Sequence, residues 1–124
     1  MPAEPRVIAM RSEIKLTILD STDKASIVAI SGHLGMEASQ ELDRELKKAT
    51  SRTHKSSIID LSGVDFITSY GVRLFLDVLQ ALEKEGKKLF LVNPQPSVKE
   101  VLVDCEMDTL AGIFDTKEAA LAAL

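Results

Sequence analysis

Three hydroxyl-bearing side chains stand side by side in this sequence, where an acidic stretch passes into a long segment with helical patterning. They are Thr68, Ser69 and Tyr70, and Gly71 follows them. A helix that begins here would place the Ser69 hydroxyl beside unpaired backbone N–H groups and the positive end of the helix dipole. A phosphate group at such a position would leave the fold intact and would still place negative charge against a docked partner. The spacing therefore indicates a phosphorylation site, and its alternative is a serine that only caps the helix.

The predicted helix after Ser69 carries more apolar residues than its core-facing stripe needs. That stripe comprises Val72, Phe75, Leu76, Leu79 and Leu82. Leu74 and Val78 widen the apolar arc, which is then either covered by the third helix or left exposed as a docking surface. Gly71 leaves little side-chain bulk to obstruct a partner or a kinase. The partner-binding residues expected on this basis are Thr68, Ser69, Tyr70, Gly71, Leu74 and Val78.

Motifs for other chemistries are incomplete. Ser69 and Gly71 match part of the nucleophile elbow Gly-x-Ser-x-Gly, but Ile67 occupies the first glycine position, whose small size the sharp turn needs. The two histidines, His33 and His54, are not in metal-ligand spacing. The sequence contains neither Gly-x-x-x-x-Gly-Lys-Ser/Thr nor Gly-x-Gly-x-x-Gly, the two glycine-rich motifs whose backbone binds phosphate groups. We therefore expect no enzyme activity, no metal and no cofactor.

The composition argues against nucleic acid as a partner and against insertion into a membrane. The chain has 124 residues, a net charge of -4 and 4% aromatic residues, whereas nucleic-acid binding needs a concentrated basic face. A basic cluster within residues 47–55 is interpreted as cations at a helix C-terminus. No apolar run reaches the roughly 18 residues of a membrane helix. Cys105 is the single cysteine, so an internal disulfide is excluded, which fits a reducing, cytoplasmic location. Cys105 also falls on an apolar helical stripe, where we expect it to pack in the core.

The hydrophobic periodicity predicts one α/β domain, residues 14–124, after a flexible N-terminal tail, residues 1–13, that forms at most one edge strand. The opening β-rich runs predict an antiparallel hairpin, and the later alternation of strands and helices predicts parallel strands with right-handed crossovers. We expect a mixed four- to five-stranded sheet with helices packed against it. Strands are expected at 14–18, 25–30, 57–61, 88–92 and, as a short last one, 112–115. Helices are expected around 38–49, 72–86, 97–105, where a capping box starts at Ser97, and 116–124.

The segment 60–71, Asp-Leu-Ser-Gly-Val-Asp-Phe-Ile-Thr-Ser-Tyr-Gly, resembles the signature of STAS domains, especially of bacterial anti-sigma factor antagonists. The resemblance covers roughly residues 14–124 and implies a STAS-like fold. In that family the serine matching Ser69 is phosphorylated by a partner that is both an ATP-dependent serine kinase and an anti-sigma factor, and a PP2C-type phosphatase reverses the reaction. The unphosphorylated form binds that partner and frees the sigma factor. The resemblance thus implies a cytoplasmic protein-binding switch that regulates transcription.

Two positions depart from the family pattern. The family usually carries Asp just before the serine and Ser or Thr just after it, where this chain has Thr68 and Tyr70. Other branches use the same domain as a scaffold in stress-signalling assemblies or as a cytoplasmic subunit of lipid-transporting ABC systems. A constitutive scaffold is therefore the alternative to the switch.

Overall fold

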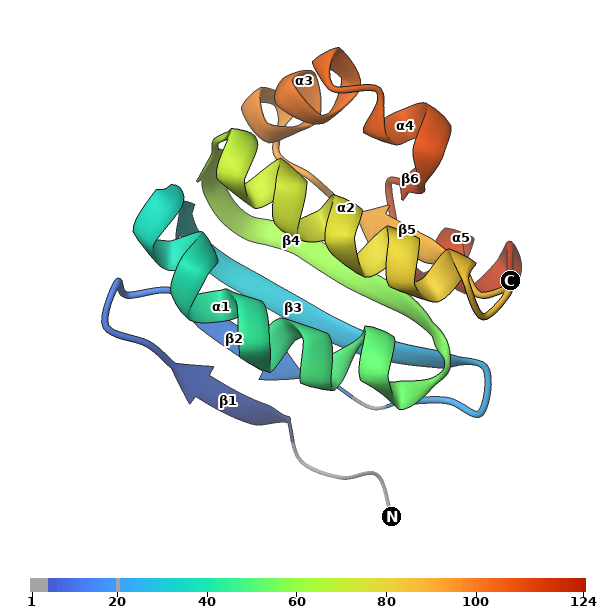
Figure 1. Ribbon diagram of the computed structural model, residues 1–124. Coiled ribbons are helices and arrows are strands. Elements are labelled where there is room, and N and C mark those ends of the chain that lie inside the picture. The colour runs from blue at the N-terminus through green and yellow to red at the C-terminus, as the bar shows by residue number, and fades with distance from the viewer. Residues whose placement is uncertain (1–4, 20) are drawn as a thin grey trace.

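The computed structural model of the protein describes residues 5–19 and 21–124 (Figure 1). The six strands are β1 (Arg6–Ala9), β2 (Lys15–Ile18), β3 (Ala25–Leu34), β4 (Ser56–Ile67), β5 (Leu89–Val92) and β6 (Gly112–Phe114). The helices are α1 (Met36–Ala49), α2 (Ser69–Glu83), α3 (Pro96–Asp104), α4 (Met107–Leu110) and α5 (Lys117–Ala122), with a 3₁₀ turn, η1 (Ser51–Thr53), after α1.

The strands form one mixed sheet in the order β1-β2-β3-β4-β5-β6. The pairs β1/β2 and β2/β3 are antiparallel, and the pairs β3/β4, β4/β5 and β5/β6 are parallel. The α/β class, the antiparallel opening hairpin and the parallel strands are thus confirmed. The predicted count of four to five strands is one too low, because β1 lies within the segment that was expected to be a tail.

The N-terminal segment is tied to the domain by pairing and by side-chain hydrogen bonds. Ile8 of β1 packs against the main core. After β1, the Ser12 hydroxyl donates to Glu41 Oε1 at 2.8 Å, and the Ser12 backbone N–H donates to Glu41 Oε2 at 3.3 Å. The hydrogen bond from the Ser12 side chain is the main reason why the pKa of the Glu41 carboxyl is lowered. The segment around Ser12 is therefore held against α1.

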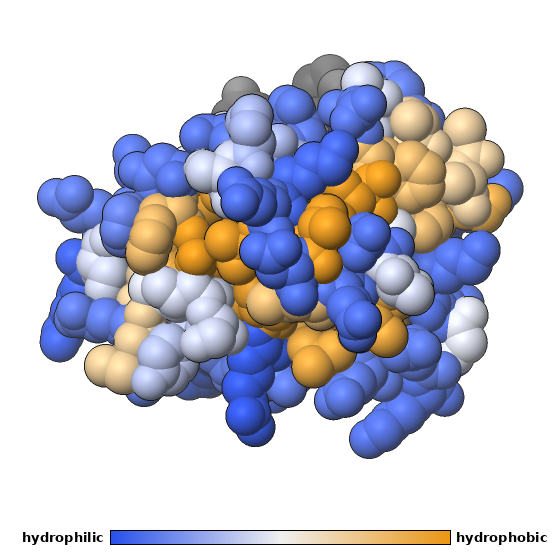
Figure 2. All heavy atoms as spheres, turned by 90° about the horizontal axis from the view of Figure 1, so that it is seen from above, coloured by the Kyte–Doolittle hydropathy of each residue, from blue (hydrophilic) through white to orange (hydrophobic). Residues whose placement is uncertain are grey.

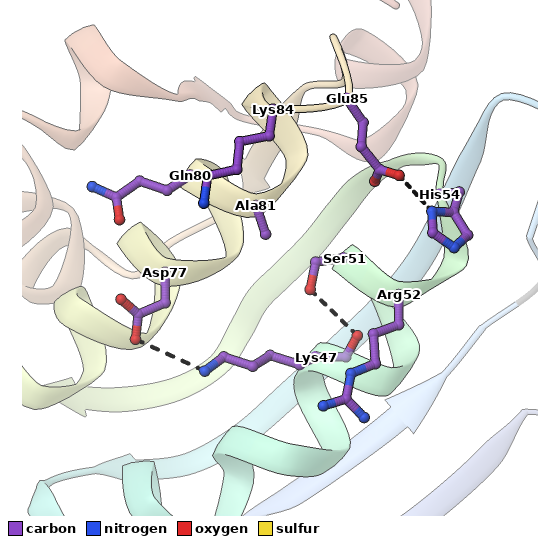
Figure 3. Close-up of a pocket in the computed structure, with 9 residues that line it drawn as sticks. All are labelled: Lys47, Ser51, Arg52, His54, Asp77, Gln80, Ala81, Lys84 and Glu85. Atoms are coloured by element: carbon purple, nitrogen blue, oxygen red, sulfur yellow. Dashed lines mark hydrogen bonds and ion pairs between the residues drawn. The ribbon is translucent and has the colours of Figure 1, made fainter.

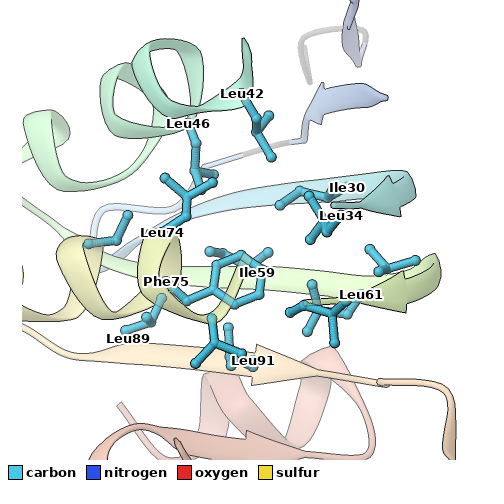
Figure 4. Packing of buried hydrophobic residues seen from close by; sticks show 14 of the residues in the cluster. Ile30, Leu34, Leu42, Leu46, Ile59, Leu61, Leu74, Phe75, Leu89 and Leu91 are labelled. Atoms are coloured by element: carbon cyan, nitrogen blue, oxygen red, sulfur yellow. The ribbon is translucent and has the colours of Figure 1, made fainter. Parts of the chain in front are cut away.

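The helices cover the two faces of the sheet unequally. Figure 1 shows α1 and α2 side by side across one face, where the larger core lies. On the opposite face, α5 contributes Ala120 to a smaller core with Ile58 of β4 and Phe90 of β5. Figure 4 shows Phe75 projecting from α2 towards the sheet, close to Ile59 and Leu91. The alternation of side chains along each strand supplies both cores, because successive residues point to opposite faces.

The two central strands run further than the sequence indicated. β3 continues to Leu34 and β4 to Ile67, whereas the expected strands ended at residues 30 and 61. Two register shifts interrupt their pairing. β4 holds one extra residue between the pairs Ala29/Asp60 and Ser31/Gly63, and a second before the pair His33/Phe66. Such bulges bend a strand and re-aim its side chains. The ends of β3 and of the bulged strand β4 lead directly into the first turns of α1 and α2.

The third helix differs from its prediction at both ends. α3 begins at Pro96 with Gln95 as N-cap, so the expected capping box at Ser97 is not formed. Proline is favoured at this first helical position because its missing N–H has no helical partner there. At the other end α3 stops at Asp104, which leaves Cys105 as the C-cap and exposed rather than in the core.

Candidate functional site

Ser69 is the first residue of α2, and it is exposed. The preceding residue, Thr68, occupies the N-cap position but does not cap, because its hydroxyl donates to the Leu34 carbonyl oxygen at 3.1 Å. The Thr68 backbone N–H donates to the same oxygen at 3.1 Å. The interpretation of Ser69 as the helix cap is therefore wrong. The Ser69 side chain does not cap the N-terminus of α2.

The first turn of α2 leaves several polar groups available. The Val72 N–H donates to the Thr68 carbonyl oxygen at 3.1 Å, which closes the first helical hydrogen bond. Among residues 5–19 and 21–124, the N–H groups of Ser69, Tyr70 and Gly71 and the Ser69 Oγ find no hydrogen-bond partner. Uncapped helix N-termini carry partial positive charge and favour negatively charged groups. The environment of Ser69 therefore suits a phosphate ester.

Gly71 is needed for close packing inside the domain rather than for the approach of a partner or kinase to Ser69. It is buried, and a Cβ atom there would lie 2.8 Å from Ile67 Cγ1 and 3.2 Å from Leu34 Cβ. Only glycine lets the first turn of α2 sit this close to the ends of β3 and β4. The prediction that Gly71 forms part of the partner-binding surface is therefore wrong.

Replacing Gly71 with alanine is expected to lower the free energy of unfolding by about 1–3 kcal/mol, because the added methyl group must displace Ile67 from a filled site. Urea denaturation followed by circular dichroism measures this change. Gly35→Ala is the matched control, since a Cβ at Gly35 meets nothing within 4 Å. Equal losses in the two variants would contradict the packing role of Gly71.

Leu74 and Val78 are also buried, with exposed fractions of 4% and 0%. They were expected to contribute to a docking face, and that expectation is wrong. The apolar arc of α2 is wide because it packs against two neighbours, the sheet below it and α1 beside it. Figure 4 shows Leu74 next to Leu46 of α1. Helix α1 lies beside α2 here, whereas the third helix was expected to cover this arc if it was not exposed.

Several exposed large side chains lie at the same end of the sheet as Ser69. Tyr70 is 49% exposed, Phe66 at the end of β4 is 44% exposed, and Met36 at the start of α1 is 50% exposed. The His33 ring stacks on Phe66 with centroids 4.3 Å apart and planes 15° apart, and its Nδ1 lies 3.1 Å from Asp65 Oδ1. We call this surface the Ser69 face; it consists of His33, Met36, Phe66, Ser69 and Tyr70.

The Ser69 face is assembled by topology. β3 and β4 are parallel neighbours, with His33 paired to Phe66 and Leu34 paired to Ile67, so both strands end at the same edge of the sheet. The helices that follow them start at this edge, which brings Met36 and Ser69 to one end of the molecule. Sequence reasoning missed Phe66 and Met36; the signal for Phe66 was a large aromatic residue within a polar stretch.

A groove of about 720 Å³ continues from Ser69 along α2. Its lining residues are Ser69, Tyr70, Val72, Arg73, Leu76, Asp77, Gln80 and Cys105. Figure 2 views the molecule from the side of α3 and α4, and it shows apolar surface broken up by polar side chains. Half-buried Val101 and exposed Val103 of α3 and exposed Leu110 of α4 are apolar residues on this side. Leu76 of α2, expected in the core, is half-buried: it packs against the core and also lines the groove.

A second hollow of about 650 Å³ lies at the opposite end of α2, between the C-terminal ends of α1 and α2 (Figure 3). Lys47 bridges Asp43 at 2.8 Å and Asp77 at 3.9 Å, and His54 pairs with Glu85. Cations are stabilised near the carbonyl ends of helices. The basic cluster is therefore explained by the helix ends that it surrounds, as the sequence analysis interpreted it.

No helix within the described residues has both the length and the apolar character needed to cross a membrane. The same part of the chain holds no group of three or more His, Cys, Asp or Glu side chains arranged to bind a metal ion.

Comparison with known proteins gives consistent results. The sequence model of the STAS domain matches residues 16–120. A Bordetella bronchiseptica protein, provisionally named anti-sigma factor antagonist BtrV, is 28% identical over 110 residues, which cover 89% of this chain and 94% of that protein. The crystal structure of an anti-sigma factor antagonist from Mycobacterium paratuberculosis superposes with a TM-score of 0.80 at 23% identity, covering 94% of this chain and 97% of that one. The phosphorylated form of Bacillus SpoIIAA gives a TM-score of 0.66 at 20% identity, covering 87% and 97%. At these identities the two structures establish a shared fold.

Proposed function

The chain belongs to the STAS domain family, and from this premise we propose that it is an anti-sigma factor antagonist that is switched by phosphorylation of Ser69. The name of the Bordetella relative supports the class of function. The observation that carries the switch is the Ser69 side chain, which is exposed at the start of α2 and forms no hydrogen bond with the described residues. The protein is not an enzyme in this account and acts in the cytoplasm.

In the unphosphorylated state the Ser69 face docks on the anti-sigma factor, which then releases its sigma factor. Phe66, Tyr70 and Met36 are the anchors, because large exposed side chains at the centre of an interface supply most of its binding energy. The partner also acts as the kinase. The γ-phosphoryl group passes from ATP to Ser69 Oγ, the hydroxyl proton goes to a base of the kinase, and ADP leaves. A PP2C-type phosphatase restores the hydroxyl by hydrolysis.

The departures at Thr68 and Tyr70 have distinct consequences in this proposal. The Thr68 hydroxyl is engaged with the Leu34 carbonyl oxygen, so it holds the start of α2 against the end of β3. The Tyr70 ring, in contrast, is half exposed beside the acceptor. The kinase must therefore accommodate an aromatic ring next to Ser69, which makes Tyr70 a residue that distinguishes cognate partners from others.

Replacing Phe66 with alanine is expected to weaken binding of the anti-sigma factor about 30-fold, which corresponds to about 2 kcal/mol for an aromatic anchor. Isothermal titration calorimetry with the purified partner measures the change. Val7→Ala is the matched control, because Val7 is 57% exposed on the edge strand β1, away from the Ser69 face. If Phe66→Ala binds as tightly as Val7→Ala, Phe66 is not an anchor.

A constitutive scaffold, including a subunit of a lipid-transport system or a stress-signalling complex, is the competing function, and the departures at Thr68 and Tyr70 favour it. Pull-downs from lysate of the native host with wild-type, Ser69→Ala and Ser69→Asp baits separate the two. The switch predicts that wild type and Ser69→Ala retain a small ATP-binding anti-sigma factor and that Ser69→Asp loses it. Equal capture of a transporter or scaffold component by all three baits would replace the switch with the constitutive module.

A further inference from the structure

Ser69 and Arg73 lie one helical turn apart on the same side of α2. Residues four apart on a helix are surface neighbours, with Cβ atoms about 5–6 Å from each other. Both side chains line the groove of about 720 Å³ that runs along α2, and both residues are exposed. The Arg73 guanidinium can therefore reach a group attached to Ser69 Oγ without any movement of the backbone.

The charge of Arg73 is not used elsewhere in the described structure. Within residues 5–19 and 21–124 Arg73 forms no ion pair and no side-chain hydrogen bond. The two carboxylates that line hollows together with Arg73 are those of Asp43 and Asp77. Both are bridged by Lys47, at 2.8 Å and 3.9 Å. The remaining ionisable residues that line these hollows, Tyr70 and Cys105, are not carboxylates.

We propose that Arg73 is the intramolecular partner of phosphoserine at position 69, and that it holds the phosphate along α2 at the mouth of the groove. Guanidinium groups bind phosphate oxygens through two parallel hydrogen bonds, which fix direction as well as distance. This inference rests on the proposed phosphorylation of Ser69 and deepens it. Arg73 is a positioning residue that holds the phosphate at the mouth of the groove, next to the Ser69 face that the unphosphorylated chain offers to its partner.

This pairing of Arg73 with phosphoserine, which we call the clamp, also explains how phosphorylation of Ser69 affects partner binding without changing the fold. A free phosphoserine side chain at a helix start samples many directions, whereas a paired one stays on one side of the helix. Pairing with Arg73 keeps the phosphate next to α2, at the groove that Arg73 lines together with Leu76 and Gln80. The negative charge then lies across the groove as well as on the Ser69 face.

The test places phosphoserine directly at position 69 of the full chain and follows its phosphate by ³¹P NMR as a function of pH. The second pKa of the phosphate is ordinarily about 6. In the chain with Arg73 it is expected to be about 0.5 lower than in Arg73→Gln, because a neighbouring cation favours the dianion. Arg73→Lys is expected to give an intermediate value, since it retains the charge and loses the paired donors.

Arg52→Gln is the matched control, because Arg52 is an exposed arginine in the hollow at the far end of α2. In Arg52→Gln the second pKa of the phosphate is expected to equal that in the chain that carries both Arg52 and Arg73. Equal phosphate pKa values in the chains with and without Arg73, or an equal effect of Arg52→Gln, would overturn the clamp. Since neither a kinase nor a partner enters this titration, its outcome is independent of whether phosphorylation of Ser69 controls binding.

Discussion

Phosphoserine at position 69 is expected to weaken binding of the anti-sigma factor at least about 100-fold, a change of about 2.7 kcal/mol. The phosphate adds about -1.5 to -2 charges to a surface whose exposed neighbours are Phe66 and Tyr70. A partner docked on the Ser69 face would have to remove that charge from water, and an incompletely paired buried charge costs several kcal/mol. No large conformational change is needed.

The affinity is measured by calorimetry with the purified partner, the unmodified chain and the chain carrying phosphoserine. Ser69→Ala is expected to bind like the unmodified chain, because the Ser69 hydroxyl supports no other described residue. Ser69→Asp is expected to be intermediate, since a carboxylate carries less charge than a phosphate. Equal affinities of the phosphorylated and unmodified chains would contradict the switch.

Replacing Phe75 with alanine is expected to lower the free energy of unfolding by about 3–5 kcal/mol. Phe75 has no exposed surface and packs under α2 in the larger core, near Ile59 and Leu91 (Figure 4). The loss combines the transfer energy of the ring with the cavity that remains. It is a large part of the stability of a single domain, which is typically about 5–15 kcal/mol.

Urea denaturation monitored by circular dichroism measures the effect of Phe75→Ala. Val7→Ala serves as the control for this experiment too, because its exposed position predicts a change within about 0.5 kcal/mol. A loss in Phe75→Ala no larger than in the control would show that the core around Phe75 is loosely packed and would contradict the packing described for α2.

The parts of the fold that depend on local periodicity were predictable from the sequence. The stripe of Val72, Phe75, Leu79 and Leu82 is buried as expected, because a helical period of 3.6 residues sets which side faces the sheet. The opening hairpin followed from alternation and turn residues. The N-terminal segment was expected to form at most one edge strand, and β1 is that strand. Four residues give too short a pattern to distinguish an edge strand from a tail.

The start of a helix at Ser69 was predictable, but the surroundings of Ser69 were not, because they depend on contacts between distant segments. Thr68 and Ser69 are equally suitable caps from sequence alone, and the Leu34 carbonyl oxygen, supplied by another strand, decides how Thr68 is used. In the same way, the width of the apolar arc on α2 does not reveal that Leu74 and Val78 are buried, with Leu74 next to α1. The bulges that bring Phe66 to the surface likewise arise from the pairing of β4 with β3.

The switch can be followed by incubating the chain with its purified anti-sigma factor and ATP. Peptide mass spectrometry then maps the phosphate, and size-exclusion chromatography follows the complex. Phosphate is expected to accumulate on Ser69 alone while the complex dissociates in step with it, and neither event is expected in Ser69→Ala. Phosphate on another residue, or a complex that persists after Ser69 is fully phosphorylated, would rule out the switch.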